Sequence, residues 1–133
     1  MRTAVDSSVL LDVVLDDPRF ADRSEIALRA AATAGALVIG ECVLAEIRPA
    51  FRSVSIDEFL SDWGLQFVPG TLQSGLLAGE IFARYVDRRR QTPVRVLPDF
   101  LIGAHAMLNA DRLLARDRGY YRDYFRSLDL VQP

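Results

Sequence analysis

The sequence of 133 residues contains no lysine, so its 16 basic residues are all arginines. This absence excludes chemistry that needs a side-chain amine, such as Schiff-base formation. Arginine instead suits bidentate contacts with phosphates and carboxylates. No apolar run approaches the ~20 residues that a membrane-spanning helix needs, so we expect no transmembrane segment.

Cysteine and histidine each occur only once, as Cys42 and His105. A single cysteine forms no disulfide within the chain, and its apolar neighbours favour a small buried residue over a nucleophile. Zinc binding through histidine and cysteine is not expected, and His105 is interpreted as a partly buried helix residue. The first residues lack the charged leader and apolar core of a signal peptide, so we expect a cytoplasmic protein.

Half of the residues are hydrophobic and the formal net charge is −2. The length and the apolar content predict a single domain over residues 1–133 with a real core. A nearly neutral chain does not by itself indicate a nucleic-acid-binding protein, although local basic clusters can still bind phosphates.

Short apolar runs alternate with helical patterns along the chain. The runs that predict strands are residues 3–5, 36–39, 65–69, 112–116 and 128–132, and a brief extended run is expected at 94–96. Helical patterns begin near Ser8 and then cover residues 22–35, 40–52, 55–67, 71–91, 98–110 and 118–125. This order predicts an α/β fold, a three-layer α/β/α sandwich around a mostly parallel sheet of four to five short strands.

Two finer features of the helical patterns lead to local predictions. Asp22 and Glu25 form an Asp-x-x-Glu pattern, which predicts that Asp22 caps the helix that follows. Gly75 and Gly79 lie four residues apart, which indicates close contact with a neighbouring helix or serves ordinary packing.

Four carboxylates stand out by their positions. Asp6 ends the first predicted strand, Asp99 follows a proline at a helix start, and Asp117 follows the fourth run. Glu46 interrupts an otherwise apolar helical segment. Because ligands bind at the carboxyl ends of the strands of a parallel α/β sheet, we expect these side chains to converge there.

Converging carboxylates repel one another unless a cation lies between them. Mg²⁺ prefers such oxygen ligands, and one or two ions there would support phosphodiester hydrolysis. Each residue also has a plainer interpretation. Asp6 and Asp117 could be cap or turn residues, Asp99 could complement a helix dipole, and Glu46 could lie on an exposed stripe.

Four segments in register resemble one family. They are "AVDSSVLLD", "ECVLAEI", "LPDFLIGAHA" and "LLARDRGYYRDYF". Together they resemble the PIN domain and, more narrowly, the VapC-type ribonuclease toxins of bacterial and archaeal toxin–antitoxin pairs. The resemblance implies Mg²⁺ or Mn²⁺ and endonucleolytic cleavage of RNA by a metal-activated water. It also implies a homodimer, and a heterotetramer or larger assembly with a small antitoxin that blocks the site.

The resemblance assigns roles residue by residue. The family's acidic metal-binding positions correspond in this sequence to Asp6, Glu46, Asp99 and Asp117. Ser8 matches a polar position that supports the first aspartate. A departure is found two residues before the last aspartate, where the family often has serine or threonine and this chain has alanine at position 115. Glu41 ranks below Glu46 as a ligand.

An acidic site repels RNA unless basic side chains offset its charge. Arg116 and Arg118 are the first candidates for phosphate contacts, and the second set is Arg122, Arg88, Arg89, Arg90 and Arg95. Three tyrosines, Tyr120, Tyr121 and Tyr124, are candidates to stack on unpaired bases. The competing interpretation is a solvated arginine face and tyrosines in the core and its rim.

Other classes of protein explain the sequence less well. A phosphoacceptor receiver domain needs a lysine, and a dinucleotide-binding fold needs a glycine-rich first turn, which "DSSVLLD" lacks. Two alternatives stay open: a non-catalytic PIN-like domain that binds RNA or protein, and a PIN nuclease that is not a toxin.

Overall fold

The structure, a computed structural model, describes residues 1–89 and 96–133. One five-stranded sheet, with every pairing parallel, has the order β3-β2-β1-β4-β5. Its strands are β1 (Thr3–Val5), β2 (Leu37–Ile39), β3 (Leu65–Phe67), β4 (Arg112–Leu114) and β5 (Asp129–Val131). The predicted α/β class and the predicted strand number are therefore confirmed.

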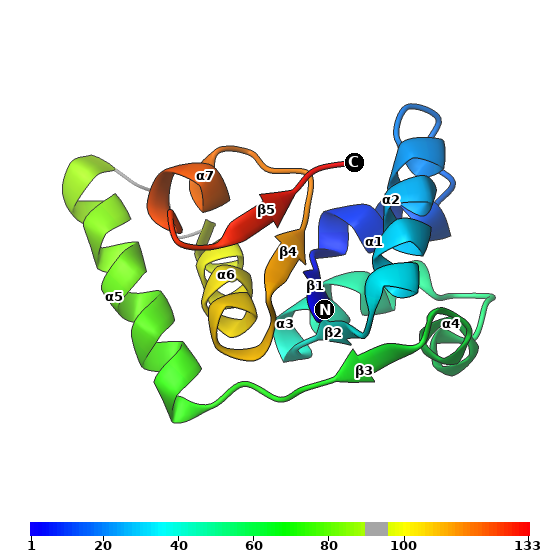
Figure 1. The fold of residues 1–133 in the computed structure, drawn as a ribbon, viewed down its shortest axis with the longest axis horizontal. Coiled ribbons are helices and arrows are strands. Elements are labelled where there is room, and N and C mark those ends of the chain that lie inside the picture. Colours follow the sequence, from blue (N-terminus) through cyan, green and yellow to red (C-terminus); the bar gives the residue numbers. More distant parts are fainter. Residues whose placement is uncertain (90–95) are drawn as a thin grey trace.

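Helices cover the sheet on both sides, as the alternating pattern predicts. They are α1 (Ser7–Val14), α2 (Ala21–Ala34), α3 (Glu41–Ile47), α4 (Ile56–Trp63), α5 (Leu72–Arg89), α6 (Leu97–Asn109) and α7 (Tyr120–Tyr124). A 3₁₀ turn at Arg48–Ala50 contains Pro49 and follows α3. In Figure 1 the sheet lies between one group formed by α5, α6 and α7 and another formed by α1, α2 and α4.

The central strands are short but fully buried. Every residue of β1 and β2 is buried, because parallel strands covered on both faces have no solvent side. Phe100 on α6 and Leu10 on α1 are completely buried and contribute to the same core as these strands. No helix of the described residues is long and apolar enough to cross a membrane.

The carboxyl end of β1 lies in the middle of the sheet, between its two pairing partners. Asp6 follows β1 directly, and its backbone N–H donates to the carbonyl of Leu114 at the end of β4 at 2.9 Å. Gly40 follows β2 and opens α3. The order of the strands therefore brings α1, α3 and the segment after β4 to one edge of the sheet.

Two local predictions are wrong. Asp22 does not cap α2: the helix starts at Ala21, and the Asp17 carboxylate accepts from the backbone N–H groups of Arg19 at 2.8 Å and Phe20 at 3.0 Å. Among the described residues, Gly75 and Gly79 make no close contact with a neighbouring helix, because a Cβ at either position would meet nothing within 4 Å. The extended run expected at 94–96 and the last two residues of the 71–91 pattern lie mostly outside the described residues.

Candidate metal site

Asp6 is buried at the junction of β1 and α1, where the sequence first suggested a cap or a metal ligand. Its carboxylate accepts from the Ser8 backbone N–H at 3.0 Å, so it is the N-cap of α1. The Ser8 hydroxyl donates to the same oxygen, Oδ2. The Tyr121 hydroxyl donates to the other oxygen, Oδ1, at 2.7 Å. Oδ2 uses both of its lone pairs in the Ser8 bonds, whereas Oδ1 accepts one bond and keeps a lone pair for a ligand, so the capping role and a ligand role are compatible.

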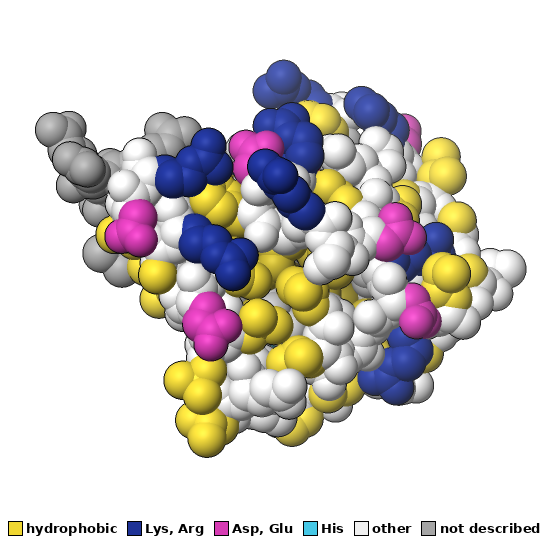
Figure 2. Space-filling view, turned by 60° about the vertical axis from the view of Figure 1, so that its left-hand side comes forward, with side chains coloured by type: hydrophobic (Ala, Val, Ile, Leu, Met, Phe, Trp, Pro, Cys, Tyr) yellow, Lys and Arg dark blue, Asp and Glu magenta, His cyan; other side chains and the backbone are white. Residues whose placement is uncertain are grey.

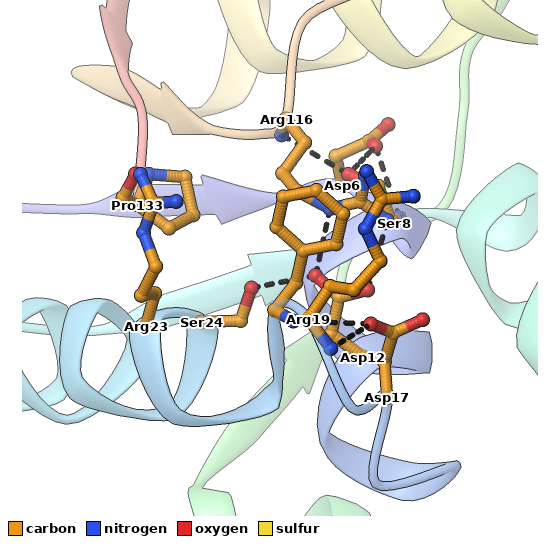
Figure 3. Close-up of polar contacts among 10 residues, drawn as sticks. Asp6, Ser8, Asp12, Asp17, Arg19, Arg23, Ser24, Arg116 and Pro133 are labelled. Carbon is orange, nitrogen blue, oxygen red and sulfur yellow. Dashed lines mark hydrogen bonds and ion pairs between the residues drawn. The ribbon is translucent and has the colours of Figure 1, made fainter.

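The Ser8 hydroxyl makes two hydrogen bonds, one to Asp6 and one to the chain after β4. The hydroxyl donates to Asp6 and accepts from the backbone N–H of Arg116 at 3.1 Å, which links α1 to the segment after β4 (Figure 3). Ala115 is buried and brings no hydroxyl here. The side-chain hydroxyls that hold Asp6 are instead those of Ser8 and Tyr121.

Glu46 lies on the exposed stripe of α3, but its carboxylate is tied to α1. The Ser7 hydroxyl donates to Glu46 Oε1 at 2.8 Å. Ser7 is buried and directly follows Asp6. The start of α1 therefore contacts the carboxylates of both Asp6 and Glu46. This role of Ser7 was not predicted, because the sequence does not show that α3 packs against α1.

Asp99 lies in the first turn of α6 and faces an arginine. Arg118 Nη2 is 3.1 Å from Asp99 Oδ2, and the Asp99 side chain is only 15% exposed. Burial raises the pKa of Asp99, the Arg118 guanidinium lowers it, and the charges of Asp6 and Glu46 raise it further. Asp6 and Glu46 therefore lie close enough to Asp99 for their charges to act on it.

Asp117 has a different set of partners from the other three. Its Oδ1 accepts from the backbone N–H groups of Gly119 at 2.9 Å and Tyr121 at 3.1 Å, and its Oδ2 accepts from that of Arg122 at 3.1 Å. These bonds shape the turn before α7 and fix the helix that carries Tyr121. The contacts of Asp117 thus match the turn or cap role left open above.

The pKa of the Cys42 thiol reflects its burial and the negative charges near it. Burial raises its pKa to about 12, and the charges of Glu46, Asp6, Asp99 and Glu41 add to the increase. This thiol is only partly buried and lies within 3.8 Å of the Pro98 carbonyl. Cys42 is therefore a neutral packing residue, and negative charge is concentrated around it.

A divalent cation fits this donor set by chemistry. Asp6, Glu46 and Asp99 offer hard carboxylate oxygens, and their mutual repulsion falls when a cation lies between them. As they stand in residues 1–89 and 96–133, no three His, Cys, Asp or Glu side chains are close enough to hold one ion. Each carboxylate here is satisfied by its own partner: Asp6 by two hydroxyls, Glu46 by a hydroxyl and Asp99 by a guanidinium.

Arg116 does not face the site. Its guanidinium makes two bonds to Asp12, Nε to Oδ2 at 2.7 Å and Nη2 to Oδ1 at 2.8 Å, and stacks over the Phe20 ring (Figure 3). Asp12 is buried and also accepts from the Ser24 hydroxyl at 2.6 Å. This pair joins α1, α2 and the chain after β4. Sequence reasoning missed it, because Asp12 and Arg116 are far apart in the chain.

The three tyrosines fall into two groups. Tyr121 is buried against Asp6 and has no face for a base, which corrects the stacking role considered for it. Tyr120 and Tyr124 are half-buried and pack edge-to-face against Tyr85 with centroids 5.5 Å apart in both cases. They form the rim of the core.

Glu41 and His105 have structural partners. Glu41 Oε2 accepts from the backbone N–H of Gly70 at 2.7 Å, and His105 Nε2 bonds to the Val68 carbonyl at 2.7 Å. Of the other arginines considered for phosphate contacts, Arg122 pairs with Asp123 at 3.0 Å. Arg90 and Arg95 lie outside the described residues.

The comparisons with known proteins agree with this architecture. The family model of the PIN domain matches residues 3–125. No curated protein matches the sequence.

Three solved structures share the fold over nearly the whole chain. The VapBC2 structure from Rickettsia felis, bound to a DNA fragment from its promoter, aligns with a TM-score of 0.72 at 20% identity and covers 100% of this chain and 99% of its own. DNA-bound VapBC from Salmonella typhimurium gives 0.65 at 15% identity and covers 99% and 98%. VapBC-1 from nontypeable Haemophilus influenzae gives 0.66 at 17% identity and covers 99% and 98%.

Proposed function

The chain belongs to the PIN domain family, and from this we propose that it is a metal-dependent endoribonuclease, the VapC-type toxin of a type II toxin–antitoxin pair. The observation that carries the proposal is the position of Asp6, Glu46 and Asp99 at the carboxyl edge of the sheet. Asp6 follows β1 and bonds to the end of β4, and the Ser7 hydroxyl joins Glu46 to the first turn of α1. Asp99 pairs with Arg118 after β4, and the charges of Asp6 and Glu46 act on it. The proposal takes residues 1–133 as one PIN domain in the cytoplasm.

Asp6 and Asp99 are the proposed principal ligands of Mg²⁺ or Mn²⁺. Glu46 completes the set from α3, and Asp117 contributes from the turn before α7, directly or through the position of Tyr121. A bound divalent cation supplies an activated water and offsets the charge of the scissile phosphate. Release of Arg118 from Asp99 frees one carboxylate oxygen for the cation and one guanidinium for a phosphate.

The arrangement of the chain's own groups serves this chemistry. Ser8 and Tyr121 fix the rotamer of Asp6, so its oxygens are held in place before any ligand arrives. Ser7 does the same for Glu46. Hydrolysis by this route needs no side-chain nucleophile, which agrees with the neutral Cys42 thiol.

A protein partner is the second part of the proposal. The solved structures with this fold are VapBC complexes, and we propose a small antitoxin for this chain and a homodimer in the assembly with it. Leu72 and Leu76 on α5 are 81% and 60% exposed. Exposure of these apolar side chains to water is unfavourable, and burial against a second copy of the chain would remove that cost. The proposal names RNA as the class of substrate.

The test is cleavage of RNA by the purified chain with Mg²⁺ or Mn²⁺, against Asp6→Asn and Asp99→Asn. We expect each variant to lose at least about 100-fold in rate, because a lost metal ligand removes both charge and geometry. Asp22→Asn, on the exposed start of α2, is the control for the loss of one carboxylate. Undiminished cleavage by both site variants would exclude the metal site.

One observation favours a second candidate, a non-catalytic PIN-like domain that binds RNA or protein. Asp99 already forms an ion pair with Arg118, so one of the three carboxylate charges is opposed without a cation. Under this alternative the wild type binds neither Mg²⁺ nor Mn²⁺ in calorimetry and cuts no RNA. Cleavage by the wild type without growth arrest on expression would instead indicate a PIN nuclease that is not a toxin.

A further inference from the structure

A polar hollow of about 410 Å³ lies beside the carboxylates, between α5 and α7. Arg118 lines it and also bonds to Asp99, so the hollow begins one side chain away from the proposed metal ligands. Arg88 and Arg126 line its other sides. Figure 2 shows arginine side chains gathered on this part of the surface with apolar side chains between them.

The charge of the hollow is positive in a protein whose net charge is negative. Three arginines and one acidic residue, Asp123, line it, and because Asp99 opposes the charge of Arg118, the excess positive charge rests on Arg88 and Arg126. Asp123 forms an ion pair with Arg122, which lies outside the lining, so its charge is already opposed. The pKa of Asp123 is lowered first by its hydrogen bond from Arg122 and then by the charges of Arg88 and Arg126. An anion entering the hollow meets the same positive field.

The floor of the hollow is aromatic. Tyr120 and Tyr124 line it together with Tyr85, which is buried beneath them. The guanidinium of Arg118 lies 5.7 Å from the centre of the Tyr120 ring, and that of Arg88 lies 5.6 Å from the centre of the Tyr124 ring. Because a guanidinium lies over each ring, a base can stack on the guanidinium plane, or on the ring once the arginine moves, and stacking tolerates every base because each has a π face.

We propose that this hollow is a subsite for one unpaired nucleotide of an RNA strand, with its phosphate on Arg88 and Arg126 and its base against Tyr120 or Tyr124. This subsite belongs to the proposed function and rests on it, because only that function identifies the strand as RNA. Arg118 lies between the subsite and the carboxylates. On RNA binding, its guanidinium would leave Asp99 and bind the phosphate at the scissile position. An unpaired strand fits better than a duplex, because bases in A-form helices are not free to stack on side chains.

The experiment measures binding without cleavage, so its outcome is independent of catalysis. The full chain, in EDTA, is titrated into 5′-fluorescein-labelled single-stranded decauridylate, followed by anisotropy from 50 to 200 mM salt. The test variant is Arg88→Gln/Arg126→Gln. Arg23→Gln/Arg52→Gln removes the same charge from exposed positions on α2 and before α4, at the other end of the molecule (Figure 1).

We expect the test variant to lower the slope of log affinity against log salt by about 0.7, since the two arginines hold one phosphate and each phosphate contact on a single strand contributes about 0.7. The control double variant should keep the wild-type slope, and Arg88→Lys/Arg126→Lys should keep most of it. Thermal unfolding of every variant checks that the fold is retained. An equal decrease of this slope in both glutamine double variants would show that only the net charge of the protein matters, and would overturn the subsite.

Two further probes separate the nucleotide from other anions. A decamer of ribose phosphate without bases should bind at least about fivefold more weakly than decauridylate, because stacking on one aromatic side chain is worth that much or more. Decaglutamate should compete poorly. Equal binding of the abasic strand, or equally good competition by decaglutamate, would overturn the proposal, and the latter would point to an acidic protein segment.

Discussion

Arg116→Met should destabilise this protein strongly, although Arg116 lies outside the proposed metal site. The Asp12 side chain is 3% exposed, and its carboxylate accepts two bonds from Arg116 and one from Ser24. Methionine keeps much of the stem that packs on Phe20 but leaves the carboxylate buried with a single hydroxyl donor. Removing one partner of a buried pair costs about 3–5 kcal/mol.

The opposite substitution should cost less. In Asp12→Asn the amide still accepts from Ser24, and the Arg116 side chain, which is 35% exposed, can turn its charge toward water. We expect a loss of about 1–2 kcal/mol. Within the Arg116→Met background, Asp12→Asn should restore stability by about 1–3 kcal/mol, because it removes the uncompensated charge.

Urea unfolding followed by circular dichroism measures these differences in the free energy of unfolding. For a chain of this size, 3–5 kcal/mol corresponds to roughly 10–18 °C in Tm. A loss below about 1 kcal/mol at pH 7, or further destabilisation by Asp12→Asn in that background, would refute the reasoning.

Three more outcomes follow from single contacts. Tyr121→Phe removes the 2.7 Å bond to Asp6, and we expect about 10–100-fold weaker Mn²⁺ binding in calorimetry with a fold that survives, whereas unchanged affinity would deny Tyr121 a positioning role. Burial and then the nearby carboxylates raise the pKa of the Cys42 thiol to about 12, so it should react with a disulfide reagent at pH 8 at least about tenfold more slowly than in urea, and comparable rates would contradict the raised pKa. Gly103→Ala would place a Cβ 2.6 Å from the Phe125 ring and should cost about 1–3 kcal/mol in chemical unfolding. The control Gly79→Ala, in an open helix position, should stabilise by about 0.5–1 kcal/mol, and equal effects at both sites would argue against the close packing at Gly103.

Much of the architecture could be predicted because it depends on local pattern. Apolar runs of three to five residues between helical segments predict buried parallel strands, and all five strands lie within the expected runs. The cap of α4 is also a local feature: Ser55 and Glu58 form a Ser-x-x-Glu pattern, and the Ser55 hydroxyl accepts from the Glu58 backbone N–H at 3.2 Å. The cap of α2 was wrong, since a turn that starts at Asp17 competes with the later Asp22 pattern.

The sequence by itself determined the α/β class, the PIN resemblance and the set of carboxylates at strand ends. These depend on the order of residues and on the rule that strand ends meet at one edge. Only the tertiary structure decided which partner each charge has. It placed Arg116 on Asp12, Arg118 on Asp99 and Tyr121 on Asp6. The physical reason is that residues with similar sequence contexts differ in burial and in their neighbours across the sheet, and those neighbours are set by packing between segments about 20 to more than 100 residues apart.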